Sequence, residues 1–375
     1  MKKEYTFVEL FAGCGGLSTG LEQAGFTPCF VNEIVETYCN TYKKNHKLSD
    51  DQYYVGDINE LNKHLDDYSQ YISEPTLVCG GPPCQGFSMA NRQRVIDDPR
   101  NSLYKAYLTF LSHSRPLFFI MENVKGMANK IDEIKENFRD FLGDEYQFDY
   151  ALLRAQDFGV PQNRERLIFI GNRAGVDPKK IFEEIEKQKR PAFTLKDALE
   201  GLPHLDARKE KGLKDVEEEA TGLTSRPFTY TQNEFYRFIN GKKTLKTLFN
   251  HKNRYNNERD IEIYRRLPQG ANSLHESIAD IMPYKRRNDI FKDKYFKLDE
   301  SQICKTITSH MRFDCNMYIH PWEARGLSPR EAARIQTFPD DYVFTGAQNT
   351  WYAQIGNAVP VKLAYVLGKA IKKFL

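Results

Sequence analysis

The stretch TFVELFAGCGGL, residues 6–17, decides the fold of this chain. It predicts a short apolar strand, Thr6 to Leu10, that runs into a glycine-rich turn and then into a helix from Ser18. The same pattern of an apolar strand and a polar or glycine-rich end returns four more times. Strands alternating with helical stretches indicate a parallel α/β sheet, in which ligands bind beyond the carboxyl ends of the strands. The four further strands are Cys29 to Asn32, Tyr53 to Gly56, Thr76 to Cys79 and Leu117 to Met121.

The strand ends indicate a nucleoside cofactor. Glycines at the first turn let backbone amides approach a ligand, and Glu33 after the second strand suits a ribose diol. Asp57, after the third strand, adds an acceptor for an adenine amino group. Ser18 stands where the dinucleotide fingerprint needs a third glycine, so a pyrophosphate is not indicated. Taken alone, the glycines would equally fit an ordinary turn.

A single thiol follows the fourth strand directly after two prolines, in Gly80-Gly81-Pro82-Pro83-Cys84-Gln85-Gly86-Phe87-Ser88. Prolines fix φ and donate no backbone N–H, so they suit a stiff loop at a strand exit. A rigidly presented Cys84 is a candidate nucleophile. By itself it could also be a buried small hydrophobic residue.

These runs, in this order, resemble the cytosine-5 DNA methyltransferases along nearly the whole chain. The resemblance implies a Rossmann-like, S-adenosylmethionine-dependent methyltransferase sheet with a second, smaller target-recognition domain. It places the catalytic, cofactor-binding domain at residues 1–195 plus 350–375 and the target-recognition domain at 196–349. The runs that carry it are Phe11-Ala12-Gly13-Cys14-Gly15-Gly16, Pro82-Pro83-Cys84-Gln85, Asp98-Pro99-Arg100-Asn101-Ser102-Leu103, Glu122-Asn123-Val124, Gln162-Asn163-Arg164-Glu165-Arg166, Arg330-Glu331-Ala332-Ala333-Arg334-Ile335-Gln336 and Gln354-Ile355-Gly356-Asn357-Ala358-Val359-Pro360.

The resemblance implies S-adenosyl-L-methionine as cofactor and S-adenosyl-L-homocysteine as its product. In the family an aromatic residue often follows the ribose-binding glutamate and packs on adenine. This chain has Ile34 there, so that stacking contact is not expected. The implied cofactor-binding residues are Phe11, Ala12, Gly13, Gly15, Gly16, Leu17, Glu33, Ile34, Asp57, Ile58, Pro82, Leu103, Asn357, Ala358 and Val359.

Cytosine-5 methylation requires a nucleophile because carbon 5 of cytosine is itself unreactive. Cys84 would add to carbon 6, and Glu122, protonated or sharing a proton with the base, would neutralise charge at ring nitrogen 3. Arg164 and Arg166 lie two apart on an extended segment, so we expect them to project to the same side. One of them, by resemblance Arg166, would bind oxygen 2 of the base. The target base would have to flip out of the duplex.

The distribution of charge favours DNA as partner. The whole chain carries a net charge of +3, but residues 227–325 hold 18 Lys or Arg against 12 Asp or Glu. This local excess would favour a polyanion, and we expect sequence recognition in this segment. The preceding stretch, Leu205 to Arg226, reads as an exposed linker or loop. The predicted DNA-binding residues are Gln85, Ser88, Arg100, Lys305 and Arg312.

Composition limits the cellular context. Seven cysteines form no CxxC pair, so neither structural zinc nor a disulfide framework is expected, and no metal site is predicted. No segment has the length and apolarity of a membrane span. We therefore expect a monomer in the bacterial cytoplasm that binds double-stranded DNA without membrane association. It would serve a restriction-modification system or a phage, alongside a cognate restriction endonuclease with which it forms no stable complex.

Three other functions share part of this pattern. A tRNA cytosine-5 methyltransferase shares many of the motifs, but that branch carries a Cys-Phe-Thr run that is missing from this sequence. A methyltransferase-like DNA-binding regulator without activity would not need Cys84, Glu122 and Arg166 together. A nicotinamide oxidoreductase would need the dinucleotide fingerprint.

Overall fold

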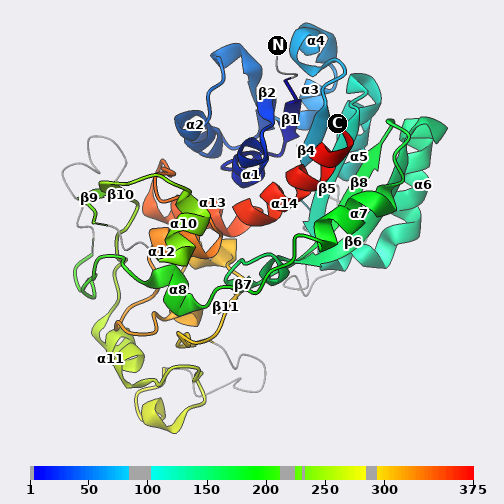
Figure 1. Ribbon diagram of the computed structural model, residues 1–375. Helices are drawn as coiled ribbons and strands as arrows, with labels where there is room; N and C mark the ends of the chain where they lie inside the picture. Colours follow the sequence, from blue (N-terminus) through cyan, green and yellow to red (C-terminus); the bar gives the residue numbers. More distant parts are fainter. Residues whose placement is uncertain (1–3, 84–102, 212–223, 230–232, 284–293) are drawn as a thin grey trace. The chain divides into compact units, whose positions relative to one another are not determined.

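The computed structural model describes residues 4–83, 103–211, 224–229, 233–283 and 294–375 (Figure 1). The chain divides into two compact units, and each is described by itself. The sheet unit comprises Met1–Gly159, Arg164–Pro191 and Ala358–Leu375, and the second unit comprises Val160–Asn163 and Ala192–Asn357. The sequence predicted a return to the first domain at residue 350, whereas the last segment of the sheet unit begins at Ala358.

A seven-stranded sheet forms the centre of the sheet unit, in the order β3-β2-β1-β4-β5-β8-β6. The first five strands of this order are parallel, and β8 runs antiparallel between β5 and β6. The predicted parallel α/β sheet is thus confirmed. Its order reverses between β1 and β4, which is where open α/β sheets bind ligands. The strands are β1 (Thr6–Leu10), β2 (Thr27–Glu33), β3 (Tyr53–Val55), β4 (Leu77–Gly80), β5 (Phe118–Val124), β6 (Gln147–Arg154) and β8 (Glu165–Asn172).

Helices cover both faces of this sheet (Figure 1). Side chains of α3, α5 and α6 share one apolar core with Val8, Leu10 and Phe119 of the strands. On the other side α14 packs against α1 and α7. The helices of the unit are α1 (Gly16–Ala24), α2 (Glu36–Asn45), α3 (Ile58–Leu61), α4 (Ser69–Ile72), α5 (Leu103–Ser114), α6 (Ile131–Leu142), α7 (Pro178–Glu186) and α14 (Val361–Ile371).

The contact between α1 and α14 fixes the helix that begins at the glycine-rich turn. A Cβ at Gly20 would lie 2.3 Å from the Val361 carbonyl oxygen and 2.5 Å from the Ala364 Cβ. Glycine therefore allows the two helix backbones to approach closely. Pro360 is the N-cap of α14. Asn357 ends the preceding helix, which spans Gln348–Asn357.

The second unit has little regular sheet. It contains two two-stranded pairings, β9 with β10 and β7 with β11, within its described residues. Helices and connecting segments make up most of the rest. Its elements are β7 (Gln162–Asn163), α8 (Leu195–Leu199), β9 (Ser225–Pro227), α10 (Glu234–Asn240), β10 (Thr247–Phe249), α11 (Glu258–Arg266), β11 (Cys304–Lys305), the 3-10 turn η8 (Ser309–Arg312), α12 (Pro329–Ile335) and α13 (Gln348–Asn357).

Buried ion pairs hold the second unit together. Arg325 donates from both terminal nitrogens to Glu331, at 2.7 Å each, and both residues are at most 1% exposed. Arg334 pairs in the same way with Asp340, at 2.8 Å from Nε and 2.8 Å from a terminal nitrogen. Arg330 donates to three backbone carbonyls, those of Phe249, Pro339 and Tyr342. The signature run 330–336 therefore serves packing in this unit.

The exposed linker or loop predicted from Leu205 to Arg226 is confirmed in part. Asp206 and residues 209–211 are exposed and lie in no helix or strand, whereas Leu205 is 5% exposed and Arg208 forms a parallel bridge with Tyr255. Arg226 lies in β9. The reason is tertiary: neighbouring backbone from another part of the unit satisfies the hydrogen bonds of this polar segment. Residues 212–223 lie outside the described chain.

Candidate cofactor cradle and catalytic site

A sharp backbone turn follows β1. Phe11, Gly13 and Gly15 all have positive φ, at 55°, 57° and 84°. The turn is tied to β2 by a hydrogen bond from the Ala12 N–H to the Asn32 carbonyl, at 3.0 Å. A Cβ at Gly13 would meet no atom within 4 Å, so open space lies over this turn. A non-glycine residue such as Phe11 rarely adopts this conformation, and strain of this kind often marks a functional turn.

The carboxylate of Glu33 organises the turn. One oxygen accepts the Gly13 N–H at 2.7 Å and the other accepts the Val35 N–H at 2.8 Å. Burial raises the pKa of Glu33, which is 6% exposed, and these two backbone bonds oppose that rise. Each carboxylate oxygen can accept two hydrogen bonds, so both keep an acceptor position for a ligand.

The ends of β2 and β3 are joined beside this carboxylate. The Asn32 side-chain amide donates to the carbonyls of Tyr54, at 3.1 Å, and Gly56, at 2.9 Å. Asp57 follows and caps α3 by accepting the Asn59 N–H at 2.8 Å. Ile58 is buried. The structure thus brings Glu33 and Asp57 to adjacent strand ends, as the sequence predicted.

Three apolar side chains stand exposed at the same strand ends. Ile34 is 63% exposed, Val55 44% and Val35 38%. Exposure of large apolar side chains to water is unfavourable. Together these three side chains form an apolar surface on which a flat apolar ring can pack. The sequence analysis singled out Ile34 alone. Val35 and Val55 could also have been identified from the sequence, because each lies two residues from a polar residue at a strand end, Glu33 or Asp57.

A buried polar group under the turn was missed by the sequence analysis. Glu9 of β1 is 2% exposed and accepts a hydrogen bond from the Ser18 hydroxyl, which lies 2.6 Å from the Tyr42 hydroxyl. Burial raises the pKa of Glu9 from 4.5 to about 8, so its carboxyl is largely protonated at neutral pH. Burial also raises the pKa of the neighbouring Cys14 thiol, which makes it an unreactive thiol. The position of Glu9 inside a continuous apolar run could have indicated a buried carboxyl here, because a central parallel strand is buried on both faces.

Glu122 and Arg166 form an ion pair across β5 and β8. The distance from Arg166 Nε to Glu122 Oε1 is 2.6 Å, and the two side chains are 15% and 13% exposed. Glu122 lies inside β5, beyond the predicted strand end, because the antiparallel pairing with β8 continues to Val124 and Arg166. The pair is therefore held by two central strands and still touches solvent.

The backbone that leads to Cys84 packs against this pair. A Cβ at Gly81 would lie 2.8 Å from Glu122 Oε2, so only glycine allows the carboxylate to lie against the loop. The Asn123 side-chain amide donates to the Pro82 carbonyl at 3.0 Å. The described chain stops at Pro83. Cys84, Gln85, Ser88 and Arg100, all singled out in the sequence, lie outside the described residues.

Arg164 differs from Arg166 although the two are only two residues apart. It is 1% exposed and donates to the Ala358 carbonyl at 2.9 Å. Arg164 thus ties the start of the C-terminal segment, with Val359 8% exposed beside it, to the end of the sheet. Of the other predicted residues, Leu103 begins α5 and packs partly on the core, and Asn357 belongs to the second unit.

The two predicted DNA-binding residues that the structure describes differ in exposure. Arg312 is exposed, and its guanidinium lies 4.5 Å from the centre of the Phe313 ring. Lys305 is half-buried, with its ammonium 4.9 Å from the centre of the Phe296 ring. In the described part of the chain, no three His, Cys, Asp or Glu side chains converge as a metal site would require.

The fold is an α/β sheet in which the glycine-rich turn, Glu33 and Asp57 lie at the carboxyl ends of β1, β2 and β3, beside the switch point of the strand order. The sequence matches the C-5 cytosine-specific DNA methylase family over residues 5–373, and the chain belongs to that family. It is a cytosine-5 DNA methyltransferase.

Similar proteins cover the chain from end to end. The type II methyltransferase M.FnuDI of Fusobacterium nucleatum is 32% identical, over 98% of this chain and 94% of that protein. M1.HphI of Haemophilus parahaemolyticus is 31% identical, over 98% and 87%. A solved structure described as a prophage-encoded DNA modification methyltransferase (E. coli) has a TM-score of 0.77 at 26% identity and covers 99% of both chains. Across the residues that could be searched, the structure has no helix suited by length and apolarity to crossing a membrane.

Proposed function

We propose that this chain transfers a methyl group from S-adenosyl-L-methionine to carbon 5 of a flipped cytosine in duplex DNA, through a covalent bond from Cys84. One observation carries the proposal. The Glu122–Arg166 pair lies against the Gly81 and Pro82 backbone, directly before Cys84. The carboxyl and the guanidinium thereby lie at the carboxyl ends of β4 and β5, beside the backbone that leads into Cys84 in the sequence.

The turn after β1, with Glu33 and Asp57 at the neighbouring strand ends, forms a cradle that fits S-adenosyl-L-methionine. The open space at Gly13 admits a ligand against the backbone, and Glu33 retains acceptor positions for ribose hydroxyls. In the family an aromatic residue often packs on adenine. Here the exposed apolar side chains of Ile34, Val35 and Val55 would make that contact. Asp57 has one oxygen in its helix cap, so the other can accept the adenine amino group. When bound, the cofactor supplies a methyl group on a positively charged sulfur.

The protein's own residues then prepare the base. The Cys84 thiolate forms a bond to carbon 6, and the electrons of the broken double bond move into the ring toward nitrogen 3. Glu122 holds a proton at nitrogen 3, and Arg166 donates to oxygen 2 on the neighbouring edge of the same ring. Arg166 Nε and Glu122 Oε1 lie 2.6 Å apart, so the two groups are side by side. They can therefore contact nitrogen 3 and oxygen 2, which lie on the same edge of the cytosine ring. Arg164 is a positioning residue that holds Ala358.

We infer that the second unit is the target-recognition domain. The basic excess of residues 227–325 supports a DNA-binding role for this unit. The similarity to type II methyltransferases supports a restriction-modification role. The protein would act as a monomer and share its target sequence, without stable contact, with a restriction endonuclease.

The test uses Cys84→Ser with Cys29→Ser as the matched control. Cys29 is a half-buried thiol of the same unit whose sulfur donates to the Phe7 and Tyr71 carbonyls, bonds that a hydroxyl can also make. Cys84→Ser should abolish methyl transfer and leave DNA affinity nearly unchanged. A duplex with 5-fluorocytosine in the target site should form a denaturation-resistant adduct with the wild type and with Cys29→Ser only, because fluorine cannot leave carbon 5 as a proton does.

Two results would overturn the proposal. Wild-type turnover in Cys84→Ser would remove the covalent step. Faster methylation of tRNA than of duplex DNA under single-turnover conditions would replace the DNA substrate by tRNA.

A further inference from the structure

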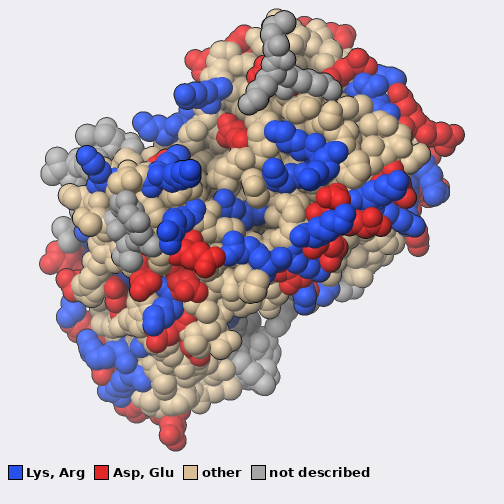
Figure 2. All heavy atoms as spheres, in the orientation of Figure 1, with Lys and Arg blue, Asp and Glu red and all other residues tan. Residues whose placement is uncertain are grey.

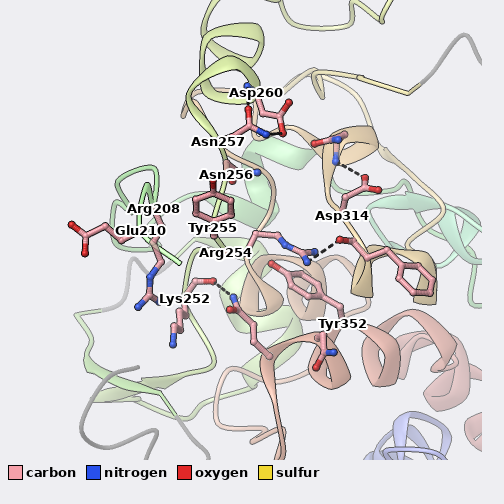
Figure 3. Close-up of a pocket in the computed structure, with 14 residues that line it drawn as sticks. Arg208, Glu210, Lys252, Arg254, Tyr255, Asn256, Asn257, Asp260, Asp314 and Tyr352 are labelled. Atoms are coloured by element: carbon pink, nitrogen blue, oxygen red, sulfur yellow. Dashed lines mark hydrogen bonds between the residues drawn. The ribbon is translucent and has the colours of Figure 1, made fainter. Parts of the chain in front are cut away.

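The second unit exposes an aromatic ring on the rim of a hollow. Phe313 follows the turn η8 and is 61% exposed, the highest value among the large apolar side chains of this unit that the structure describes. The hollow has a volume of about 490 Å³ (Figure 3). A single exposed apolar side chain is common on protein surfaces, so only the groups around Phe313 can indicate a partner.

Arg254 holds the turn that carries Phe313. Its guanidinium donates to the carbonyls of Met311 at 2.7 Å, Arg312 at 3.3 Å and Phe313 at 3.0 Å. It also lies 5.5 Å from the centre of the ring of Tyr352, which is 1% exposed (Figure 3). Because three successive carbonyls bond to one inward-lying group, the turn has a fixed shape before any partner binds.

The exposed ring is paired with basic side chains. The Arg312 guanidinium lies 4.5 Å from the centre of the Phe313 ring, and the His310 ring meets that ring edge-on at 5.3 Å. Asp314, next in the chain, uses one oxygen to accept the Asn316 N–H at 3.0 Å. An aromatic face beside an arginine matches a nucleic acid, whose bases offer apolar faces and whose phosphates offer negative charge.

The rest of the hollow suits base edges. Its lining includes five side-chain amides, a type of group that can donate to and accept from bases, together with three basic residues and three carboxylates. The Asn256 amide donates to the Tyr264 hydroxyl at 3.0 Å, while its oxygen accepts no hydrogen bond within the described chain. The amides are Asn256, Asn257, Asn316, Gln348 and Asn349, and the basic residues are Arg208, Lys252 and Arg254.

A second exposed aromatic residue of the same unit lies in a more acidic setting, whereas the basic and acidic residues around the Phe313 hollow are equal in number. Trp322 is 44% exposed and lines a separate hollow of about 310 Å³, in which its indole N–H donates to Glu300. That hollow is lined by four carboxylates and one lysine, so it would repel phosphate. Figure 2 shows basic and acidic side chains intermixed on the face in view, so net charge alone does not identify the DNA-binding surface. The difference between the two hollows favours the one beside Phe313 as the DNA-binding site.

We propose that Phe313 packs against bases of the target-site duplex while Arg312 contacts its backbone, and that Arg254 is the positioning residue that presents both. This inference rests on the proposed target-recognition role of the second unit. Contact with bases makes Phe313 a determinant of the preference for the target sequence. Contact with phosphate makes Arg312 contribute to binding of any duplex.

The test compares Phe313→Ala with Leu274→Ala, which removes another exposed apolar side chain (48%) of the same unit. Affinity is measured at one salt concentration for duplexes with and without the target site. Phe313→Ala should weaken binding of the target duplex about tenfold or more and change binding of the other duplex little. Phe313→Trp should restore most of the preference, and Leu274→Ala and Trp322→Ala should change neither affinity. Arg312→Ala should weaken both and lower the salt slope by about one.

A further variant tests whether Arg254 holds the turn that carries Phe313. The outcomes distinguish failure of the proposed role of Phe313 from failure of the proposed function. Arg254→Lys should lower the target preference as Phe313→Ala does, with an unchanged affinity for S-adenosyl-L-methionine. If the wild type methylates target DNA and Phe313→Ala keeps the full ratio of target to non-target affinity, the role of Phe313 is overturned alone. If the wild type does not methylate duplex DNA, the proposed function itself fails.

Discussion

The two units of this protein differ in the polar side chains that they bury. Large fully buried side chains of the sheet unit include Phe7, Phe30, Tyr107 and one arginine, Arg164. Those of the second unit include three arginines, Arg325, Arg330 and Arg334, beside Trp351 and several tyrosines. Polar residues of the signature runs therefore have different roles. In the sheet unit Glu122 and Arg166 meet at a partly exposed edge, while in the second unit Arg325 and Glu331 meet in the interior.

The difference follows from how each unit satisfies its backbone. A sheet bonds its own N–H and C=O groups in a ladder, which leaves apolar side chains to fill the core. The second unit has short strands, so side chains replace the ladder. Asn250 shows this: its amide donates to the Phe344 carbonyl and accepts the Phe344 N–H, each at 2.9 Å. A polar interior of this kind depends on every partner being present.

The largest effect should come from breaking the interior of the second unit. Glu331→Gln removes the charge that pairs with the buried Arg325, and we expect a loss of about 3–5 kcal/mol in the free energy of unfolding. Both tryptophans of the chain, Trp322 and Trp351, lie in this unit, so urea unfolding followed by tryptophan fluorescence reports on it.

The control for this variant is Glu262→Gln. Glu262 pairs with Arg266 at 2.8 Å on the exposed surface of the same unit, where solvent screens such a pair and its contribution to stability is small. Equal losses in the two variants would show that the buried network is not what holds the unit.

The same charge removal in the sheet unit should affect rate and not stability. Glu122→Gln should lower the methylation rate about 10²-fold or more, because the group that protonates nitrogen 3 is lost. The unfolding midpoint should stay near that of the wild type, and so should that of Glu165→Gln, which removes an exposed partner of Lys125. Single-turnover kinetics check the rate. A fully active Glu122→Gln would remove Glu122 from the chemistry.

A smaller effect is expected at the cradle. Glu33→Ala should weaken S-adenosyl-L-methionine binding by about 1–3 kcal/mol, since buried donors lose their acceptor. Glu36→Ala, an exposed carboxylate of α2, is the matched control. Asp57→Ser keeps a cap for α3 and isolates the contact with the ligand. Calorimetric titration measures all three, and unchanged affinity in Glu33→Ala and Asp57→Ser would exclude these positions from the site.

A further effect concerns pH and the buried carboxyl of Glu9 beneath the turn that follows β1. The pKa of Glu9 is raised to about 8 in the folded protein, so its favourable contribution is complete at low pH and is lost as pH rises through 8. Between about pH 5 and pH 8 the wild type should lose stability relative to Glu9→Gln. Urea unfolding followed by far-UV circular dichroism at both pH values tests this. A gap between the two proteins that does not change with pH would mean that Glu9 is ionised in the fold.

The sequence by itself determined the parallel strands, the glycine-rich turn, and the positions of Glu33 and Asp57 at strand ends, because periodicity and turn chemistry are local properties. Only the tertiary structure placed Glu122 inside β5 and separated Arg166, which pairs with Glu122, from Arg164, which holds Ala358. It also buried Leu205 and paired Arg208 with Tyr255, where the sequence predicted an exposed linker or loop. Polar side chains look alike in a sequence whether they meet solvent, a ligand or a distant carbonyl. The partner that decides among these is brought near only when the chain folds.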